Sequence, residues 1–281
     1  HPGPWLCSSE ISKYMIVPVF QADAFADILF EGNPAAVCPL PYWLPDSILQ
    51  KIAAENNLSE TAFLVKEGEM WHLRWFTPTT EVELCGHATL ASAHILFHHL
   101  HHPAREIIFS TLSGILKAEK KENMIELDFP ADQPTQAPLP EGISEALGAM
   151  PTLCLKGISD YMLVYEREED IKSLNPDFEL LRKTKARGVI VTAPGKNYDF
   201  VSRFFGPQVG INEDPVTGSA HTLLVPYWSE KTGKKSLTAR QVSSRGGTLY
   251  CTLAGNRVRI AGKAVTYMEG KIHLPDNETN L

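Results

Sequence analysis

Two short segments of the chain combine glycine with residues that can form hydrogen bonds or move protons. The segments are Cys85-Gly86-His87-Ala88-Thr89 and Asp214-Pro215-Val216-Thr217-Gly218-Ser219-Ala220-His221. Gly86 and Gly218 would let a ligand approach the backbone closely, while Ser219 and Thr89 add hydroxyl groups. Each segment begins a predicted helix, and the N–H groups at a helix start attract anions. The pattern suggests a carboxylate site, although two capped structural helices would also produce it.

Glu60 is the candidate for acid–base chemistry. It follows Asn57-Leu58-Ser59 at the start of a predicted strand, a position where loops commonly present functional residues. Desolvation in a closed cleft would raise the proton affinity of this carboxylate toward operating pH, as general acid–base catalysis needs. A solvated glutamate with no chemical role is the alternative interpretation.

The chain also repeats itself. Arg74-Trp75-Phe76-Thr77-Pro78 recurs as Arg203-Phe204-Phe205-Gly206-Pro207, at an offset of 129. Two Pro-Asp pairs that open helix-like stretches, at 45–46 and 176–177, and two hairpin patterns that begin at Gly114 and Gly247, recur at offsets of 131 and 133. A period of about 130 residues is too long for a solenoid and fits a duplicated domain.

Both halves are predicted to contain the same elements in the same order: a strand, a Pro-initiated helix, two strands, a second helix after a Gly-rich turn, and a hairpin. Before the hairpins, the predicted ranges are 16–25, 45–57, 60–65, 71–76 and 86–101 in the first half, and 161–166, 176–185, 188–193, 200–205 and 218–232 in the second. The neighbourhood equivalent to Glu60 is 187–189, which holds no carboxylate. Because this carboxylate is present in the first half alone, the role of Glu60 is expected to be specific to the functional site.

The second helix of each half is apolar on several faces, whereas a surface helix shows one apolar stripe. We therefore expect strands to wrap around each of these helices. An approximate two-fold axis between the halves would point both helix starts into one cleft.

Composition excludes some partners. The 281 residues suffice for two domains, and 43% apolar with 21% charged residues is ordinary for a soluble globular protein. The formal charge of −7 argues against nucleic acid. No apolar run approaches the roughly 18 residues of a membrane span, so no membrane is expected as a partner.

Five scattered cysteines do not resemble a disulfide framework, so a reducing, cytoplasmic location is expected. The chain has no C-x-x-C pair for a thiolate zinc site. His94, His98 and His102 share i, i+4 spacing, but no glutamate motif of the zinc-protease type accompanies them, and no metal is predicted. Residues 1–14 are interpreted as a tag or an unstructured leader, with Met15 as the natural start.

Four motifs in the same order and spacing resemble the PhzF (phenazine-biosynthesis-like) family of the diaminopimelate epimerase-like superfamily. The motifs are Gly32-Asn33-Pro34-Ala35-Ala36-Val37, Asn57-Leu58-Ser59-Glu60-Thr61-Ala62-Phe63, Leu84-Cys85-Gly86-His87-Ala88-Thr89 and Glu213-Asp214-Pro215-Val216-Thr217-Gly218-Ser219-Ala220-His221. The resemblance implies an α+β fold of two pseudo-symmetric domains, each a curved, mostly antiparallel sheet around a central helix. The expected domains are 15–130, completed by a returning strand within 267–281, and 131–266, with the active site between them.

The resemblance also implies roles for single residues. Glu60 matches the acid–base glutamate, and His87 and Asp214 match polar groups around the substrate. The positions expected to bind the substrate carboxylate and nearby oxygens are Gly86, Gly218, Ser219 and Asn33.

Two of these residues allow a further interpretation. Asp214 could cap the second central helix, orient a substrate amine or hydroxyl, or do both. His87 lies in the first turn of a helix, where the dipole disfavours a proton on imidazole, so a neutral His87 is expected.

The expected function is that of a cofactor-independent isomerase, which shifts a proton and a double bond on a small carboxylate-bearing molecule. The resemblance suggests a homodimer. The superfamily's epimerases use two cysteines, one before each central helix, and only Cys85 is present here. A two-base epimerase or racemase that uses Cys85 and a non-catalytic protein that binds a metabolite or partner remain as alternatives.

Overall fold

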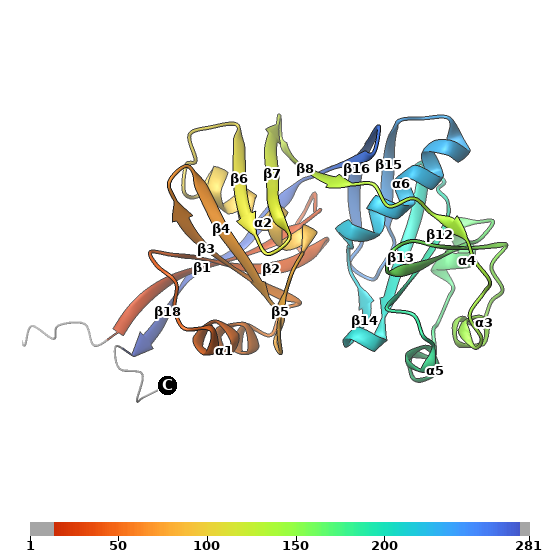
Figure 1. The fold of residues 1–281 in the computed structure, drawn as a ribbon, viewed down its shortest axis with the longest axis horizontal. Helices are drawn as coiled ribbons and strands as arrows, with labels where there is room; N and C mark the ends of the chain where they lie inside the picture. Colours follow the sequence, from red (N-terminus) through yellow and green to blue (C-terminus); the bar gives the residue numbers. More distant parts are fainter. Residues whose placement is uncertain (1–13, 276–281) are drawn as a thin grey trace, which may run out of the picture.

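The computed structural model describes residues 14–275, so 1–13 and 276–281, with most of the expected leader, lie outside the described residues. Two lobes lie side by side (Figure 1). The first is built from β1 (Tyr14–Ala24), β2 (Asn33–Leu40), α1 (Asp46–Asn56), β3 (Glu60–Glu67), β4 (Met70–Phe76), β5 (Glu81–Val82), α2 (Gly86–His98), β6 (Glu106–Thr111), β7 (Gly114–Lys121) and β8 (Met124–Pro130).

The second lobe contains several shorter elements. It is built from β9 (Thr135–Gln136), α3 (Ile143–Leu147), β10 (Leu153–Lys156), β11 (Asp160–Val164), α4 (Glu168–Lys172), α5 (Phe178–Lys183), β12 (Gly188–Pro194), β13 (Phe200–Gly206), the 3₁₀ turn η1 (Pro207–Val209), β14 (Ile211–Asp214), α6 (Gly218–Thr232), β15 (Ser236–Gln241), β16 (Gly247–Ala254) and β17 (Arg257–Gly262). The last strand, β18 (Ala264–Pro275), follows it. No helix among residues 14–275 is long and apolar enough to cross a membrane.

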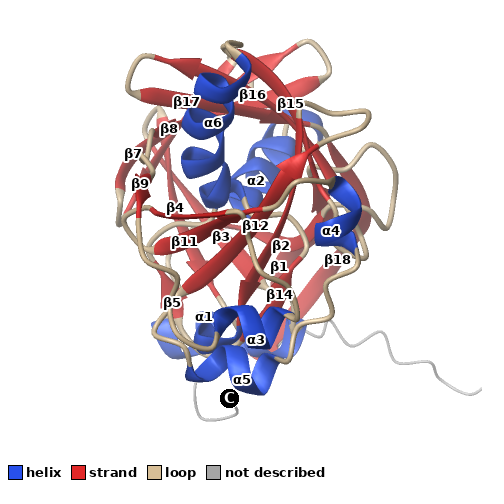
Figure 2. Cartoon of the chain, turned by 90° about the vertical axis from the view of Figure 1, so that its right-hand side faces the viewer, coloured by secondary structure: helices blue, strands red, loops and turns tan. Residues whose placement is uncertain are grey.

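The two lobes share one strand topology. β2 pairs parallel with β3, and α1 lies between these two strands in the chain. β4 pairs parallel with β6 in the same way, with α2 between them in the chain. In the second lobe β11 pairs parallel with β12, and β13 with β15, in the same way. The remaining neighbours are antiparallel, and several of them are hairpins, such as β7–β8 and β16–β17. In both views α1, α3 and α5 lie along the same edge of the molecule, α1 in the first lobe and α3 and α5 in the second (Figures 1 and 2).

The chain crosses between the lobes more than once. β17 pairs antiparallel with β8, with Arg257 opposite Pro130 and Gly262 opposite Ile125. β18 then pairs along the whole of β1, with Leu274 opposite Met15, which matches the expected return of residues 267–274. The division into domains at residues 130 and 266 stays a prediction.

The two central helices are enclosed as their composition suggested. Every residue of α2 from His87 to Phe97 is buried, and α6 is buried on several faces. β1, β2, β3, β7, β8 and β18 contact α2, while β15, β16 and β17 contact α6. Because strands surround each helix, apolar side chains on all its faces find partners, and burial of this surface is the main driving force for the fold.

The predicted end of the first central helix is wrong. Residues 86–101 were expected to form one helix, but α2 ends at His98, and His101 has a left-handed φ of 50°. The chain turns back there, since the N–H groups of Leu100 and His102 bond to the carbonyls of Ile95 and Leu96. Pro103 follows, and a residue near proline is disfavoured in a continuing helix.

A proline inside α6 ties this helix to the chain between the lobes. Pro226 has no N–H, so the carbonyl of Thr222 one turn earlier lacks its helical donor. The N–H of Asp132, directly after β8, donates to that carbonyl at 3.0 Å. Because Pro226 frees this carbonyl, α6 forms a hydrogen bond with the segment that follows β8 and links the lobes.

The repeated Arg-x-Phe motif has the same structural role in each lobe. Arg74 forms two hydrogen bonds with Glu81 on β5, at 2.7 and 2.8 Å, and Arg203 forms two with Glu213 on β14, at 2.8 and 2.9 Å. Each pair joins β4 or β13 to the short strand that leads to a central helix. Arg203 also donates to the carbonyls of Ile171 and Leu174 at 2.9 Å.

We predict that Arg203→Ala lowers the free energy of unfolding by about 3 kcal/mol, because it leaves a mostly buried carboxylate and two carbonyls without their donor. Lys117→Ala, which removes an exposed 3.4 Å pair with Glu106, should change it by less than about 1 kcal/mol. Urea unfolding of both variants checks this. Equal losses would contradict the structural role of the Arg203 pair.

A second prediction concerns acid stability. Burial lowers the pKa of His221 on α6 to about 4, so the unfolded chain binds this proton first as the pH falls. The contribution of neutral His221 is complete above its ordinary pKa of about 6.5 and is lost as the pH falls toward 4. It amounts to an order of 3 kcal/mol. In His221→Asn, urea unfolding between pH 6.5 and 4 should show a weaker pH dependence; an unchanged slope would contradict this.

Candidate functional site at the start of the two central helices

The starts of α2 and α6 meet at the interface between the lobes. A Cβ atom added to Gly86 would lie 3.4 Å from the Cα of Gly218, and one added to Gly218 would lie 3.4 Å from the Cα of Gly86. The two backbones are thus in van der Waals contact at this point. The pseudo-two-fold arrangement that the duplication suggested therefore brings both helix N-termini to one place.

Neither helix start is capped by its N-cap side chain. Cys85 and Thr217 hold the N-cap positions of α2 and α6, and neither accepts a side-chain hydrogen bond from its helix. The alternative of two side-chain-capped structural helices is therefore not what the structure shows. Free N–H groups and the positive ends of two helix dipoles face the same region, which favours a bound anion.

Glu60 is the first residue of β3 and is placed by the end of α1. Asn57 adopts a left-handed conformation, with φ 50°, and its N–H closes the helix on the carbonyl of Ala53. After this turn, Glu60 pairs with Ala35 of β2, which holds its backbone in the sheet. The side chain is only 11% exposed. The alternative of a solvated glutamate is therefore wrong.

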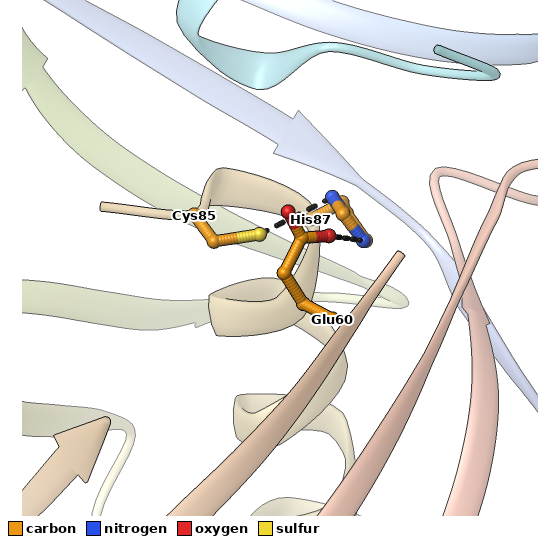
Figure 3. A group of neighbouring side chains, drawn as sticks. All are labelled: Glu60, Cys85 and His87. Atoms are coloured by element: carbon orange, nitrogen blue, oxygen red, sulfur yellow. Dashed lines mark hydrogen bonds and ion pairs between the residues drawn. The ribbon is translucent and has the colours of Figure 1, made fainter. Parts of the chain in front are cut away.

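Glu60, His87 and Cys85 form a contiguous chain of polar atoms (Figure 3). Glu60 Oε2 lies 3.1 Å from His87 Nε2, and His87 Nδ1 lies 3.3 Å from Cys85 Sγ. The contact of Glu60 with His87 is close enough for an ion pair but is not aligned as a hydrogen bond, so both atoms lack a hydrogen-bonding partner among the described residues. Buried polar atoms that lack a hydrogen-bonding partner are rare in proteins. A role at a functional site is one reason why such atoms occur.

The charge of His87 differs from the expectation. Burial alone would lower its pKa, but neighbouring Cys85 and Glu60 outweigh burial, so the pKa is raised well above the ordinary value. Burial, followed by the charge of Glu60, raises the pKa of Cys85 to about 11, while His87 acts against that rise. Glu60 lies 3.1 Å from the His87 imidazole and favours its protonated form. The raised pKa of His87 contradicts the prediction of a neutral His87, which considered the helix dipole and not the neighbouring Cys85 and Glu60.

Asp214 belongs to a second network, which crosses between the lobes. Its carboxylate accepts hydrogen bonds from Asn33 Nδ2 at 2.9 Å and Thr217 Oγ1 at 2.6 Å, and Asn33 also donates to the carbonyl of Val216 at 2.9 Å. Burial raises the pKa of Asp214, while the charge of His87 and these hydrogen bonds act against that rise. Because no helix N–H donates to this carboxylate and Thr217 is the N-cap, the interpretation of Asp214 as the helix cap is wrong.

The two hydroxyls singled out in the sequence have different surroundings. Ser219 is exposed in the first turn of α6, where a ligand can reach it. Thr89 is fully buried, and its hydroxyl donates to the carbonyl of Cys85 at 2.6 Å. Thr89 therefore supports the start of α2 and is not available to a ligand.

Two residues that hold this region together were not identified from the sequence. Gln241 Oε1 accepts from the Thr217 N–H, and its Nε2 donates to the Asp214 carbonyl, both at 2.8 Å. Arg245 reaches across the lobes to Asp23 at 2.9 Å and to the carbonyl of Gly32 at 2.9 Å. The Gly-rich stretch around Arg245 is therefore an interlobe contact as well as a turn. Its only sequence signal is a charged residue beside two glycines.

Comparison with known proteins identifies the family. The model of the phenazine biosynthesis-like (PhzC-PhzF) family matches residues 22–270. An uncharacterized isomerase of Pseudomonas aeruginosa is 52% identical over 260 residues, which cover 92% of this chain and 100% of the relative. The chain belongs to the PhzF family. A PhzF-family protein from Enterococcus faecalis has a crystal structure 47% identical to this chain, with a TM-score of 0.90, and the match covers 92% of this chain and 100% of that one.

A more distant structure supports the fold alone. A predicted epimerase from Pseudomonas aeruginosa is 21% identical to this PhzF-family chain, with a TM-score of 0.72, and the match covers 91% of this chain and 99% of the other. The predicted α+β, diaminopimelate epimerase-like fold of two pseudo-symmetric halves is therefore confirmed.

The interlobe network leads to a prediction. Asn33→Ala should lower the free energy of unfolding by about 2 to 3 kcal/mol, because the buried Asp214 carboxylate and Val216 carbonyl both lose a donor. Asn56→Ala is the matched control, since it removes a single, partly buried hydrogen bond of 3.1 Å to Thr61 within one lobe. Urea unfolding should show a loss at least about twofold larger for Asn33→Ala. Equal losses would contradict the importance of the interlobe bonds.

Proposed function

We propose that the chain is an isomerase that moves a proton on a small carboxylate-bearing molecule, with Glu60 as the acid–base group. The contact of Glu60 with His87 beside two uncapped helix starts is the main support. Three relatives that are 49 to 52% identical, two from Pseudomonas aeruginosa and one from Halalkalibacterium halodurans, are named isomerases.

In this proposal the helix starts bind the substrate carboxylate. The N–H groups near Gly86 and Gly218 point toward the region where the two helices meet, and the hydroxyl of Ser219 lies at its edge. Donors fixed in advance stabilise negative charge that develops when a neighbouring C–H bond ionises. The substrate is thus bound and made more acidic by the same groups.

Glu60 then takes a proton from one carbon and returns it to another, so that the double bond moves. His87 lies 3.1 Å from the carboxylate of Glu60 and positions it for the transfer. Asp214 and Asn33, joined across the lobes, orient the polar groups of the substrate on the other side. The proposed reaction needs no cofactor, and its proposed partners are the substrate and a second copy of the chain, in the cytoplasm.

A two-base epimerase that uses Cys85 is the second candidate, because Cys85 Sγ lies 3.3 Å from a histidine nitrogen. Two observations weigh against it. Burial raises the pKa of this thiol to about 11, which disfavours the thiolate base. The equivalent N-cap position of α6 holds Thr217, whose hydroxyl donates to Asp214 and is no replacement for a second thiol.

We predict that Glu60→Gln lowers the rate of proton exchange by at least about a hundredfold, because the amide keeps the shape of the side chain and removes the base. Small unsaturated acids and amino acids are first incubated with the wild-type protein in deuterated water. Mass spectrometry then identifies the compound that takes up deuterium, and its exchange rate is measured for each variant.

Glu83→Gln is the matched control, since this glutamate is exposed directly before α2, and it should exchange at the wild-type rate. Retained exchange in Glu60→Gln would refute the role of Glu60. Loss of exchange in Cys85→Ala, with Glu60→Gln active, would favour the two-base epimerase. Binding of a compound without exchange by the wild-type protein would favour a non-catalytic function.

A further inference from the structure

Three metal-ligating side chains converge beside the helix starts. Glu60, Cys85 and His87 each offer one ligand atom, and these atoms all lie within 4.8 Å of one another (Figure 3). All three residues are more than nine-tenths buried. Glu60 Oε2 and His87 Nε2 have no hydrogen-bonding partner among the described residues, and the carboxylate and the imidazole edge are directed toward each other. These two atoms are thus held by an ion pair of 3.1 Å and by no hydrogen bond among the described residues.

We propose that this cluster binds a divalent cation of the zinc class through the Cys85 sulfur, one His87 nitrogen and one Glu60 oxygen. Zinc accepts all three ligand types, and three protein ligands leave the fourth tetrahedral position open to water or another small ligand. A tetrahedral zinc ion holds its sulfur and nitrogen ligands about 3.5 Å apart. Cys85 Sγ and His87 Nδ1 are 3.3 Å apart, so this pair needs a shift of only a few tenths of an ångström. Glu60, which contacts His87 Nε2 in the metal-free site, turns to supply the third ligand atom.

The ligand types select the metal. A thiolate and an imidazole suit zinc, whereas magnesium and calcium require oxygen ligands. The histidines near the end of α2 do not form a comparable group, because His94 and His99 both direct Nε2 to the hydroxyl of Thr266 at 2.8 Å. His98 donates Nδ1 to the carbonyl of His94. The described residues therefore favour the helix starts over the histidine cluster as the zinc site.

Metal binding displaces protons from the cluster. Zinc takes thiolate and neutral imidazole, so the thiol proton of Cys85 and the second proton of the His87 imidazolium pass to the buffer. The Glu60 carboxylate becomes a ligand and can no longer accept a substrate proton. Zinc is therefore expected to inhibit the isomerase, and this consequence alone rests on the proposed function.

The binding test uses zinc alone and a chromophoric chelator that competes for it. The wild-type protein should bind one zinc ion per chain, and Cys85→Ser should bind it at least about tenfold more weakly, because a neutral hydroxyl replaces the thiolate ligand. Cys154→Ser and His98→Gln are the controls, since Cys154 is a buried thiol away from the cluster, and both should bind zinc like the wild type. Magnesium should not compete.

Equal zinc affinity in the wild type and Cys85→Ser, or a tenfold loss in His98→Gln, would overturn the proposed site. Cobalt(II) gives a second readout that does not depend on the folding of a variant. The wild-type protein should show the near-ultraviolet absorption of a cobalt–thiolate bond, and its absence would also overturn the proposal. If zinc binds as expected and proton exchange continues undiminished, the metal site stands and the role of Glu60 fails.

Discussion

The contact between the starts of α2 and α6 is the feature on which the rest of the site depends. The backbones of Gly86 and Gly218 touch, and any side chain at either position would occupy the contact. Both helices are enclosed by their own sheets, so their axes are fixed by the packing of the lobes and not by the site. The unpaired N–H groups of both helix starts are consequently held at one place. Leaving them unpaired costs free energy, which the burial of the large apolar cores offsets.

The two halves resemble each other in what supports the site and differ in what acts there. The Arg74–Glu81 and Arg203–Glu213 pairs brace the strand before each helix in nearly the same geometry. The partner of Glu60 in the parallel pairing is Ala35, and the equivalent pair in the second lobe is Asp160 with Gly188. A Cβ at Gly188 would lie 2.4 Å from the ring of Phe204, so no glutamate fits there. The duplication thus builds a symmetric frame in which the glutamate proposed as the acid–base group occurs in the first lobe and not at the equivalent position of the second.

The site also depends on how the lobes are joined. The side chains of Asn33 and Arg245 each donate hydrogen bonds to a carboxylate and to backbone carbonyl oxygen in the other lobe. β17 and β18 return to strands of the first half, so the interface is held by ladder hydrogen bonds as well as side chains. These contacts hold Asp214 near enough to His87 and Glu60 for both to influence its pKa, although the two carboxylates come from positions far apart in the chain.

Much of this could be predicted from the sequence. The duplicated motif, the order of elements and the enclosed helices followed from periodicity and spacing, because local backbone preferences and apolar pattern carry that information. The end of α2 was placed three residues too late, since the turn at His101 depends on hydrogen bonds to Ile95 and Leu96. The sequence motifs identify the residues of the site as a group, but they do not give the distances between the side chains.

The sequence by itself determined the family, the two-lobed fold and the residues that gather at the site. Only the tertiary structure decided the neighbours that raise the pKa of His87, the partners of Asp214 and the convergence of Glu60, Cys85 and His87. The physical reason is that proton affinity and metal ligation depend on distances of about 3 Å between side chains. Such distances are set where separate segments pack together, and no spacing along the chain encodes them.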